Sequence, residues 1–84
     1  MSSVPLPRER RALAVAIREL RARRGLTQED VSGAAGLGRG YVTDLETGRR
    51  RASFDAIVLV ARALDVSMVE LMTVYEARLA DQSG

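Results

Sequence analysis

The chain has 84 residues and a formal net charge of +2, and it contains neither cysteine nor histidine. This composition excludes disulfides, soft metal sites and the usual proton shuttle, and the length allows one domain with a small core. The longest apolar run, residues 56–61, is too short to span a membrane, and the start of the chain lacks the pattern of a secretory signal. We therefore expect a cytoplasmic protein without a membrane partner.

The charges are unevenly distributed along the chain. Residues 1–51 hold eleven arginines against six acids, whereas residues 52–84 hold two arginines against five acids. The first part of the chain is therefore suited to a polyanion. Every basic residue is arginine, whose forked head matches phosphate and the edge of guanine, although a GC-rich coding genome would produce the same bias.

Two prolines and two serines in residues 1–7 predict a flexible N-terminal arm, followed by a single domain over residues 8–80. The first helix is expected from Arg8 to Arg24 and should end at Gly25. Its basic start is interpreted as solvated. Apolar residues recur along it at the spacing of a core-facing stripe. They are Leu13, Ile17 and Leu20.

The stretch from Thr27 to Gly48 predicts two short helices joined by a glycine turn. Thr27 precedes Gln28, Glu29 and Asp30, which is typical of a capped helix start with acids in the first turn. Val31, Ala34 and Ala35 should form an apolar stripe of mostly small side chains, and Gly36 should end the helix. The second helix is expected over residues 39–47, with Val42 and Leu45 on its inner face.

This stretch, TQEDVSGAAGLGRGYVTDLETG, resembles the helix-turn-helix of the Cro and cI repressor family, also called the XRE family. The small Ser32, the turn glycine and the apolar positions all fall at the separations of that motif. The resemblance implies an all-α, five-helix lambda-repressor-like DNA-binding domain whose recognition helix is residues 39–47. A helical hairpin without a ligand is the alternative. Gly38 departs from the pattern, since the family usually has Ser or Thr as the N-cap there, and this predicts a recognition helix that frays at its start.

The resemblance also implies which side chains face DNA. The base-reading positions would be Arg39, Gly40, Thr43 and Asp44, with Arg39 matching guanine, Thr43 a thymine methyl and Asp44 a cytosine amine. Gly40 offers no side chain at a position where family members often read a base. The phosphate contacts would come from residues at the helix starts and from the loop after the recognition helix. They are Thr27, Gln28, Tyr41, Arg49, Arg50 and Arg51.

One ion pair is also implied by the family. An arginine at the place of Arg21 pairs there with the glutamate near the end of the recognition helix, which here is Glu46. Such a bridge would fix the first helix against the recognition helix. Two unrelated surface charges are the alternative.

Two further helices are expected over residues 53–80, before a flexible tail at 81–84. The first starts at Ser53 with a stripe through Phe54, Ile57, Val58, Ala61 and Leu64, and the second starts at Ser67 with Glu70 completing a capping box. Both carry more apolar residues than one small core needs, so we expect them to form a homodimer. The candidate interface residues are Leu59, Val60, Met68, Met72, Tyr75 and Leu79.

We therefore predict a homodimeric transcription regulator that binds a palindromic DNA operator and needs no metal, cofactor or small-molecule ligand. The run Arg39, Tyr41, Val42 and Thr43, with a terminal dimer helix, looks like the controller proteins of restriction-modification systems. The alternative is a protein-interaction module on the same fold, such as an antitoxin or a bridging factor. An enzyme is not expected, because the chain has neither histidine nor cysteine, and its Ser, Asp and Glu residues are explained as caps, ion pairs or solvated faces.

Overall fold

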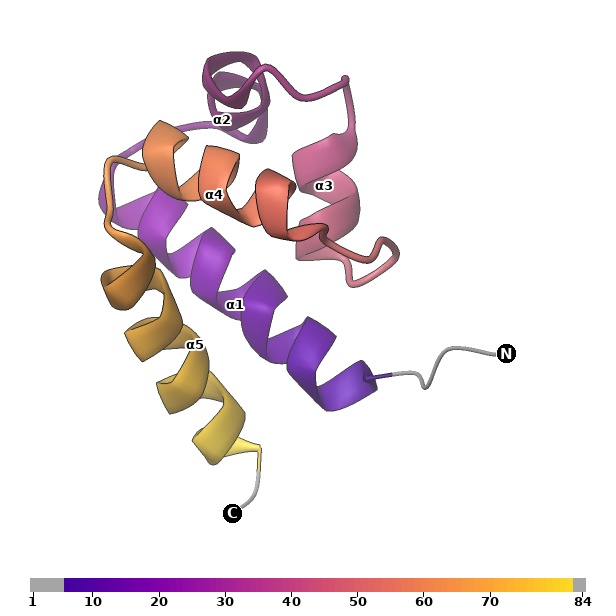
Figure 1. Ribbon diagram of the computed structural model, residues 1–84, viewed down its shortest axis with the longest axis vertical. Coiled ribbons are helices and arrows are strands. Elements are labelled where there is room, and N and C mark those ends of the chain that lie inside the picture. Colours follow the sequence, from indigo (N-terminus) through magenta and orange to yellow (C-terminus); the bar gives the residue numbers. More distant parts are fainter. Residues whose placement is uncertain (1–5, 83–84) are drawn as a thin grey trace.

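The computed structural model describes residues 6–82, which form five helices and no strand (Figure 1). The predictions for residues 1–5 and 83–84, which include most of the predicted arm and part of the tail, lie outside the described residues. Within residues 6–82, no helix is both long and apolar enough to cross a membrane. The helices are α1 (Pro7–Arg23), α2 (Gln28–Ala35), α3 (Tyr41–Glu46), α4 (Phe54–Ala63) and α5 (Met68–Asp81).

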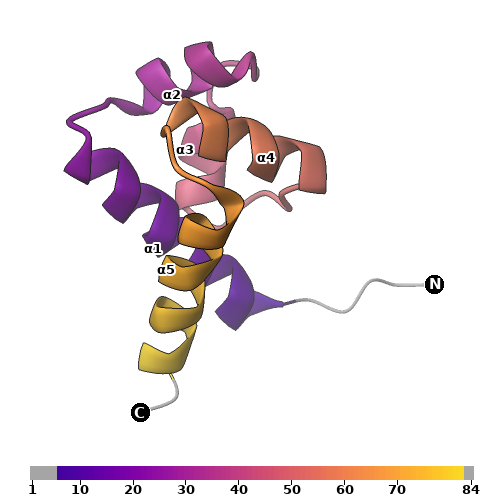
Figure 2. The ribbon, with the colours of Figure 1, turned by 60° about the vertical axis from the view of Figure 1, so that its left-hand side comes forward.

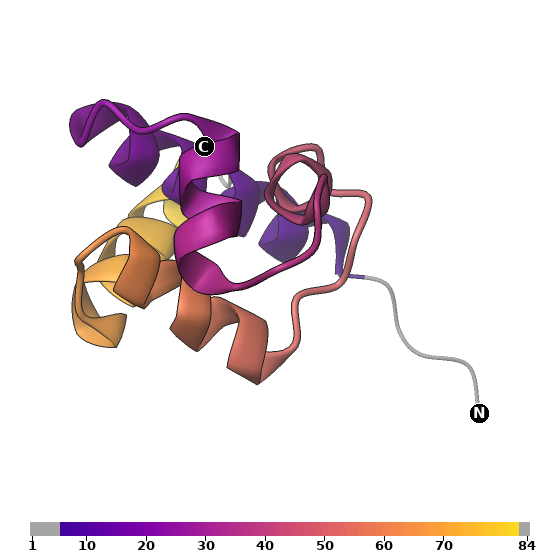
Figure 3. The same ribbon diagram turned by 90° about the horizontal axis from the view of Figure 1, so that it is seen from above.

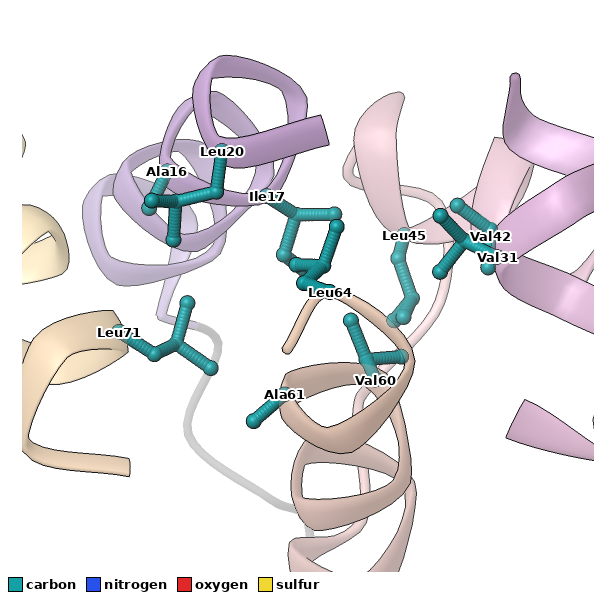
Figure 4. Close-up of a cluster of buried hydrophobic side chains, with 10 residues drawn as sticks. All are labelled: Ala16, Ile17, Leu20, Val31, Val42, Leu45, Val60, Ala61, Leu64 and Leu71. Carbon is teal, nitrogen blue, oxygen red and sulfur yellow. The ribbon is translucent and has the colours of Figure 1, made fainter. Parts of the chain in front are cut away.

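All five helices contribute to one core. Helix α1 packs against α5 and α3, while α2 packs against α4 and α3. Helices α2 and α5 lie at opposite ends of the molecule, with α4 between them (Figure 2). The side chains that meet in the centre are small or medium-sized and aliphatic, as the low aromatic content requires (Figure 4). They are Ala16, Ile17, Leu20, Val31, Val42, Leu45, Val60, Ala61, Leu64 and Leu71.

Helix α2 has the strongest start signal in the chain. The Thr27 hydroxyl accepts from the Asp30 N–H at 3.0 Å, and the Asp30 carboxylate accepts from the Thr27 N–H at 2.9 Å. This is a complete capping box, and the hydrogen bond from the Thr27 backbone lowers the pKa of Asp30. At Ser67, where we predicted a capping box, the structure has its first half: the hydroxyl accepts from the Glu70 N–H at 3.0 Å.

Several helix boundaries differ from the prediction, each by one or two residues. Helix α1 begins one residue early, inside the predicted arm, because Pro7 is well suited to a first turn. Helix α3 begins at Tyr41 rather than Arg39, since Gly40 has φ +82°, a left-handed conformation that cannot continue a helix backwards. Helix α5 continues to Asp81, one residue into the predicted tail.

The inward face of α4 also differs from the predicted stripe. Ala56, Val60 and Leu64 point inward at i, i+4 and i+8, whereas Phe54 is 72% exposed. Val60 is fully buried in the core of its own chain, so its assignment to the dimer interface is wrong. The physical reason is that α4 is apolar almost all round, and periodicity alone does not define the inner face of such a helix.

The rest of the predicted interface set is half-buried. Leu71 of α5, which is not in the predicted interface set, is the residue that closes the core, and it is fully buried. The remaining members of the set keep part of their surface exposed. They are Leu59, Met68, Met72, Tyr75 and Leu79. Burial, together with the charges of Glu9 and Glu76, raises the pKa of Tyr75.

Candidate nucleic-acid interface

The corner between α2 and α3 places α3 at the edge of the molecule (Figure 3). Gly36 ends α2 with φ +69°, and the Leu37 N–H then donates to the Ser32 carbonyl at 3.0 Å. Ala34, in the predicted stripe of α2, is exposed, while Ser32 is buried where the helices cross. The left-handed glycine therefore gives the sharp change of direction that lets α3 turn one side outward.

The inner face of α3 is held by an ion pair with α1. The Arg21 Nε and Nη2 atoms donate to the two carboxylate oxygens of Glu46 at 2.7 and 3.0 Å, and Arg21 Nη1 donates to the Leu26 carbonyl at 2.8 Å. The Glu46 side chain is only 1% exposed and that of Arg21 is 18% exposed. The predicted pair is confirmed, and its bidentate geometry fixes the end of α3 against α1.

The pKa values of the two partners shift in the directions expected of an ion pair. Burial by itself would raise the pKa of Glu46, but hydrogen bonds from Arg21 and Gln28, with the charges of Arg21 and Arg18, lower it overall. The hydrogen bond to Glu46 raises the pKa of Arg21. Both groups are therefore charged in the folded protein at neutral pH.

Gln28 links α2 to α3 through its side-chain amide. Its Nε2 donates to the Glu46 carboxylate at 3.2 Å, and its Oε1 accepts from the Thr43 hydroxyl at 2.8 Å. The Thr27 hydroxyl is likewise engaged, as the cap of α2. Thr27 and Gln28 were both predicted to contact phosphate. In the structure, their side chains hold the helix-turn-helix motif together.

The predicted base-reading residues fall into two groups. Arg39, Gly40 and Thr43 line a hollow between α2 and α3, together with Gln28 and Gly33. We call this the α2–α3 hollow. Asp44 lies outside it. Arg39 and Gly40 belong to the loop before α3, so they border the recognition helix instead of lying on it.

Asp44 belongs to a second cluster with Tyr41 and Arg50. The Arg50 Nη2 lies 3.3 Å from the Asp44 carboxylate, and its guanidinium carbon lies 4.5 Å from the centroid of the Tyr41 ring. Arg50 is therefore folded back over α3 by an ion pair and a cation–π contact. A predicted phosphate clamp and a predicted base reader are thus partners of each other in this structure.

The loop after α3 does not present its three arginines as one row. Arg49 is exposed, and Arg50 lies over α3. Arg51 lines a different groove, with Leu6, Ala52 and Ile57. No ion pair within 4.0 Å forms at Arg39, Arg49 or Arg51 in the part of the chain that the structure describes.

One contributor to the site was missed by sequence reasoning. Arg18 was given no role from the sequence, and although its side chain is 60% exposed, its Nε lies 3.5 Å from the Glu46 carboxylate and its Nη2 donates to the Glu46 carbonyl at 3.3 Å. The available signal was its spacing, since Arg18 and Arg21 are three residues apart and so lie on neighbouring parts of one helix surface.

Comparisons with known proteins agree with this geometry. The family model described as helix-turn-helix matches residues 17–71. An HTH-type transcriptional regulator of Sinorhizobium fredii, y4dJ, is 44% identical over 54 residues, which cover 64% of this chain and 70% of that protein.

Two solved structures extend the likeness to the whole fold. The clp gene regulator ClgR of Corynebacterium glutamicum superimposes with a TM-score of 0.84 at 32% identity, covering 94% of this chain and 82% of that one. The restriction-modification controller protein C.AhdI of Aeromonas hydrophila gives a TM-score of 0.71 at 39% identity, covering 74% and 94%. The chain therefore belongs to the XRE-type helix-turn-helix family, as the matched motif, the five-helix fold and these relatives together show.

Proposed function

We propose that this protein is a sequence-specific, DNA-binding transcriptional regulator whose helix α3 enters the major groove. The observation that carries the proposal is the two-sided character of α3. Val42, Leu45 and Glu46 are buried, while Thr43 and Thr47 are exposed at the edge of the molecule. A helix that packs against the domain on one side and is polar on the other is suited to entering the major groove of DNA. The transcription regulators among its relatives support this assignment.

Base reading is assigned chiefly to the α2–α3 hollow. Arg39 is exposed beside it and carries no ion pair among residues 6–82, so its guanidinium is available for the O6 and N7 atoms of guanine. The Thr43 hydroxyl is occupied by Gln28, which leaves the methyl group for apolar contact with thymine. Gly40 keeps the approach open. Asp44 accepts from cytosine only when it exchanges its contact with Arg50.

Phosphate contacts are assigned to the residues around this reading surface. Arg49 is exposed, and Tyr41 and Arg50 form one cluster beside the outer face of α3. Arg51 is assigned a phosphate contact because it is exposed and belongs to the same loop, although it lines a different groove. At the start of α2, the backbone N–H groups after Thr27 are assigned to a phosphate, whereas the Gln28 amide contacts phosphate only when it exchanges its hydrogen bonds with Glu46 and Thr43. These contacts fix register and supply affinity without reading sequence.

Dimerisation through α5 is the third part of the proposal. Val69 is 77% exposed and lies in a shallow, mainly apolar strip with Met68 and Met72. A second copy would cover this strip and relate two α3 helices by a two-fold axis. The operator would then be palindromic, with half-sites about 34 Å apart. Control of a restriction-modification operon stays a prediction, since the similar structures also include a clp gene regulator.

Selection from a random DNA pool tests this function. The full-length protein should enrich one palindromic motif and bind it with a mass in solution of two chains per duplex. Val69→Glu should lower the mass of the free protein to one chain and weaken operator binding, whereas Thr73→Glu, in the same strip but without an apolar side chain, should have a smaller effect. No enrichment of any duplex would contradict DNA regulation and favour the alternative of a protein-interaction module.

A further inference from the structure

A second groove lies between α1 and the end of α3. It encloses about 380 Å³ and is lined on α1 by Arg10, Arg11 and Arg18, with the small Ala14 at its floor, and on the other side by Thr47 and Gly48. We call this the α1–α3 groove. From the sequence, the arginines at the start of α1 were interpreted as a solvated helix end. In the structure, Arg10 is half-buried and its side chain faces a hollow.

The charge in this groove is positive and largely uncompensated. Its one carboxylate, Glu46, is 1% exposed and already pairs with two guanidinium nitrogens of Arg21, Nε and Nη2. Arg11 donates to the neutral amide oxygen of Gln82 at 3.2 Å, a contact that leaves its charge unbalanced. Arg10 has no ion pair within 4.0 Å in the described residues. An anion entering the groove would therefore meet no exposed negative charge among the lining residues.

The groove continues the outward face of α3. Thr47 lies four residues after Thr43, so the two share one side of the helix, and both are exposed. Six residues of α-helix are about 9 Å long, and the major groove of DNA is about 12 Å wide. When α3 lies in the major groove of DNA, the protein surface next to Thr47 and Gly48 consequently lies beside one phosphate backbone of the duplex.

Building on the proposed function, we propose that the α1–α3 groove binds a phosphodiester of the duplex flanking the bases that α3 reads. Arg10 and Arg11 supply the charge. Arg18, already hydrogen-bonded to the end of α3, couples the groove to the recognition helix. The ligand is recognised by charge and not by sequence, so the site adds affinity and fixes the tilt of α3 without changing which bases are preferred.

The salt dependence of binding to the selected operator tests this site. Each phosphate contact removed lowers the slope of log K against log salt by about 0.9. Arg10→Gln with Arg11→Gln, which removes both charges that contact the one phosphodiester, should therefore lower the slope by about 0.9, and Arg10→Gln alone by part of that, with the same motif still preferred. Arg62→Gln, which removes an exposed arginine of α4 outside the groove, is the matched control and should leave the slope unchanged.

Two further measurements test the cause of the change in slope. The first asks whether it comes from the lost charge, and the second whether it comes from the flanking DNA backbone. Gln82→Ala removes the Arg11 hydrogen bond but keeps both charges, so its slope should equal that of the parent protein. Trimming the duplex to the base pairs under α3 should erase the difference between parent and Arg10→Gln. An unchanged slope for the double variant on the long duplex, with parental thermal stability, would overturn this site but not the proposed function. Failure of the parent protein to prefer any duplex would overturn both.

Discussion

The two ends of α3 are held in very different ways. Its C-terminal end carries Glu46, which accepts hydrogen bonds from Arg21 on α1 and Gln28 on α2 and is almost completely buried. Its N-terminal end starts at Gly40, in a left-handed conformation and without a side-chain cap. Helix α2, by contrast, begins with a full capping box.

This difference gives the two ends of α3 different roles: one positions the helix on the domain, and the other reads bases. The buried end fixes where α3 lies on the domain, because a buried, bidentate charged pair tolerates little movement. The uncapped end, with Arg39 just before it, keeps backbone N–H groups unsatisfied by side chains and so remains adjustable when it meets bases. Variants at each end of α3 test these two roles separately.

The largest effect is expected from Glu46→Ala. It leaves the Arg21 guanidinium half-enclosed without its partner and should cost about 3 kcal/mol of unfolding free energy. Arg21→Ala should cost a similar amount. The measurement is urea unfolding followed by circular dichroism, with Arg24→Ala as control, since its ion pair with Asp65 is exposed and should contribute less than about 1 kcal/mol. Equal losses for Glu46→Ala and Arg24→Ala would contradict the anchoring role.

The pH dependence of stability should report the same anchor. The pKa of Glu46 is lower in the folded protein than in the unfolded chain, so its contribution is fully present above the unfolded pKa and is lost as pH falls through the folded one. Glu46→Gln, which cannot ionise, should therefore lose less stability than the parent between neutral and acidic pH. Parallel stability curves for the two proteins over that range would show that the carboxylate charge is not involved.

At the reading end, Arg39→Ala should weaken binding to the selected operator by about 1 to 3 kcal/mol and relax the preference at one base pair in each half-site. Thermal stability should stay the same, because Arg39 is exposed and makes no ion pair in residues 6–82. The same titration with Arg62→Ala controls for the loss of one positive charge. Retained affinity and selectivity would show that Arg39 does not read a base.

Alanine substitutions at two glycines before α3 should have smaller effects on stability, and these effects should be of opposite sign. Gly40→Ala places a side chain at φ +82° and should destabilise the protein by about 1 kcal/mol. Gly38→Ala meets open space at an ordinary φ and should be neutral or stabilising by up to about 1 kcal/mol. Thermal unfolding of the pair compares two glycines of the same loop. Equal destabilisation would indicate that the left-handed start of α3 is not required.

The smallest effect is expected from the pair of Arg50 and Asp44. Both side chains are partly exposed, so a double-mutant cycle with alanine should give a coupling below about 1 kcal/mol in stability. Operator binding gives a second readout. Because Arg50 pairs with Asp44 in the free protein, Arg50→Ala should shift the base preference at the position facing Asp44. An unchanged preference would limit Arg50 to phosphate contacts.

The sequence predicted most of what depends on local signals. Gly36, Thr27 and the apolar positions of α2 and α3 define the turn by short-range chemistry, and the match to the family extended this to the pair of Arg21 and Glu46. Where the sequence allows several faces of a helix to point inward equally well, the predicted inner face was less reliable. Helix α4 is apolar on nearly every face, so packing against α2, not periodicity, decided that Val60 is buried.

Side-chain partners across the fold were also beyond the sequence. Gln28 and Arg50 were both expected to reach outward to phosphate, yet each finds a partner on α3. Likewise, Arg10 and Arg11 acquire a common surface only because the end of α3 lies against α1. Such contacts depend on how helices distant in sequence are placed, and no spacing within a single helix encodes them.

Methylation interference on the selected operator tests whether the outward side of α3 reads bases from the major groove. Methylation of guanine N7 lies in the major groove and that of adenine N3 in the minor groove. We predict that N7 methylation of one guanine in each half-site prevents binding by the parent protein and has little effect on Arg39→Ala. Interference confined to adenine N3, or none at any guanine, would contradict the account.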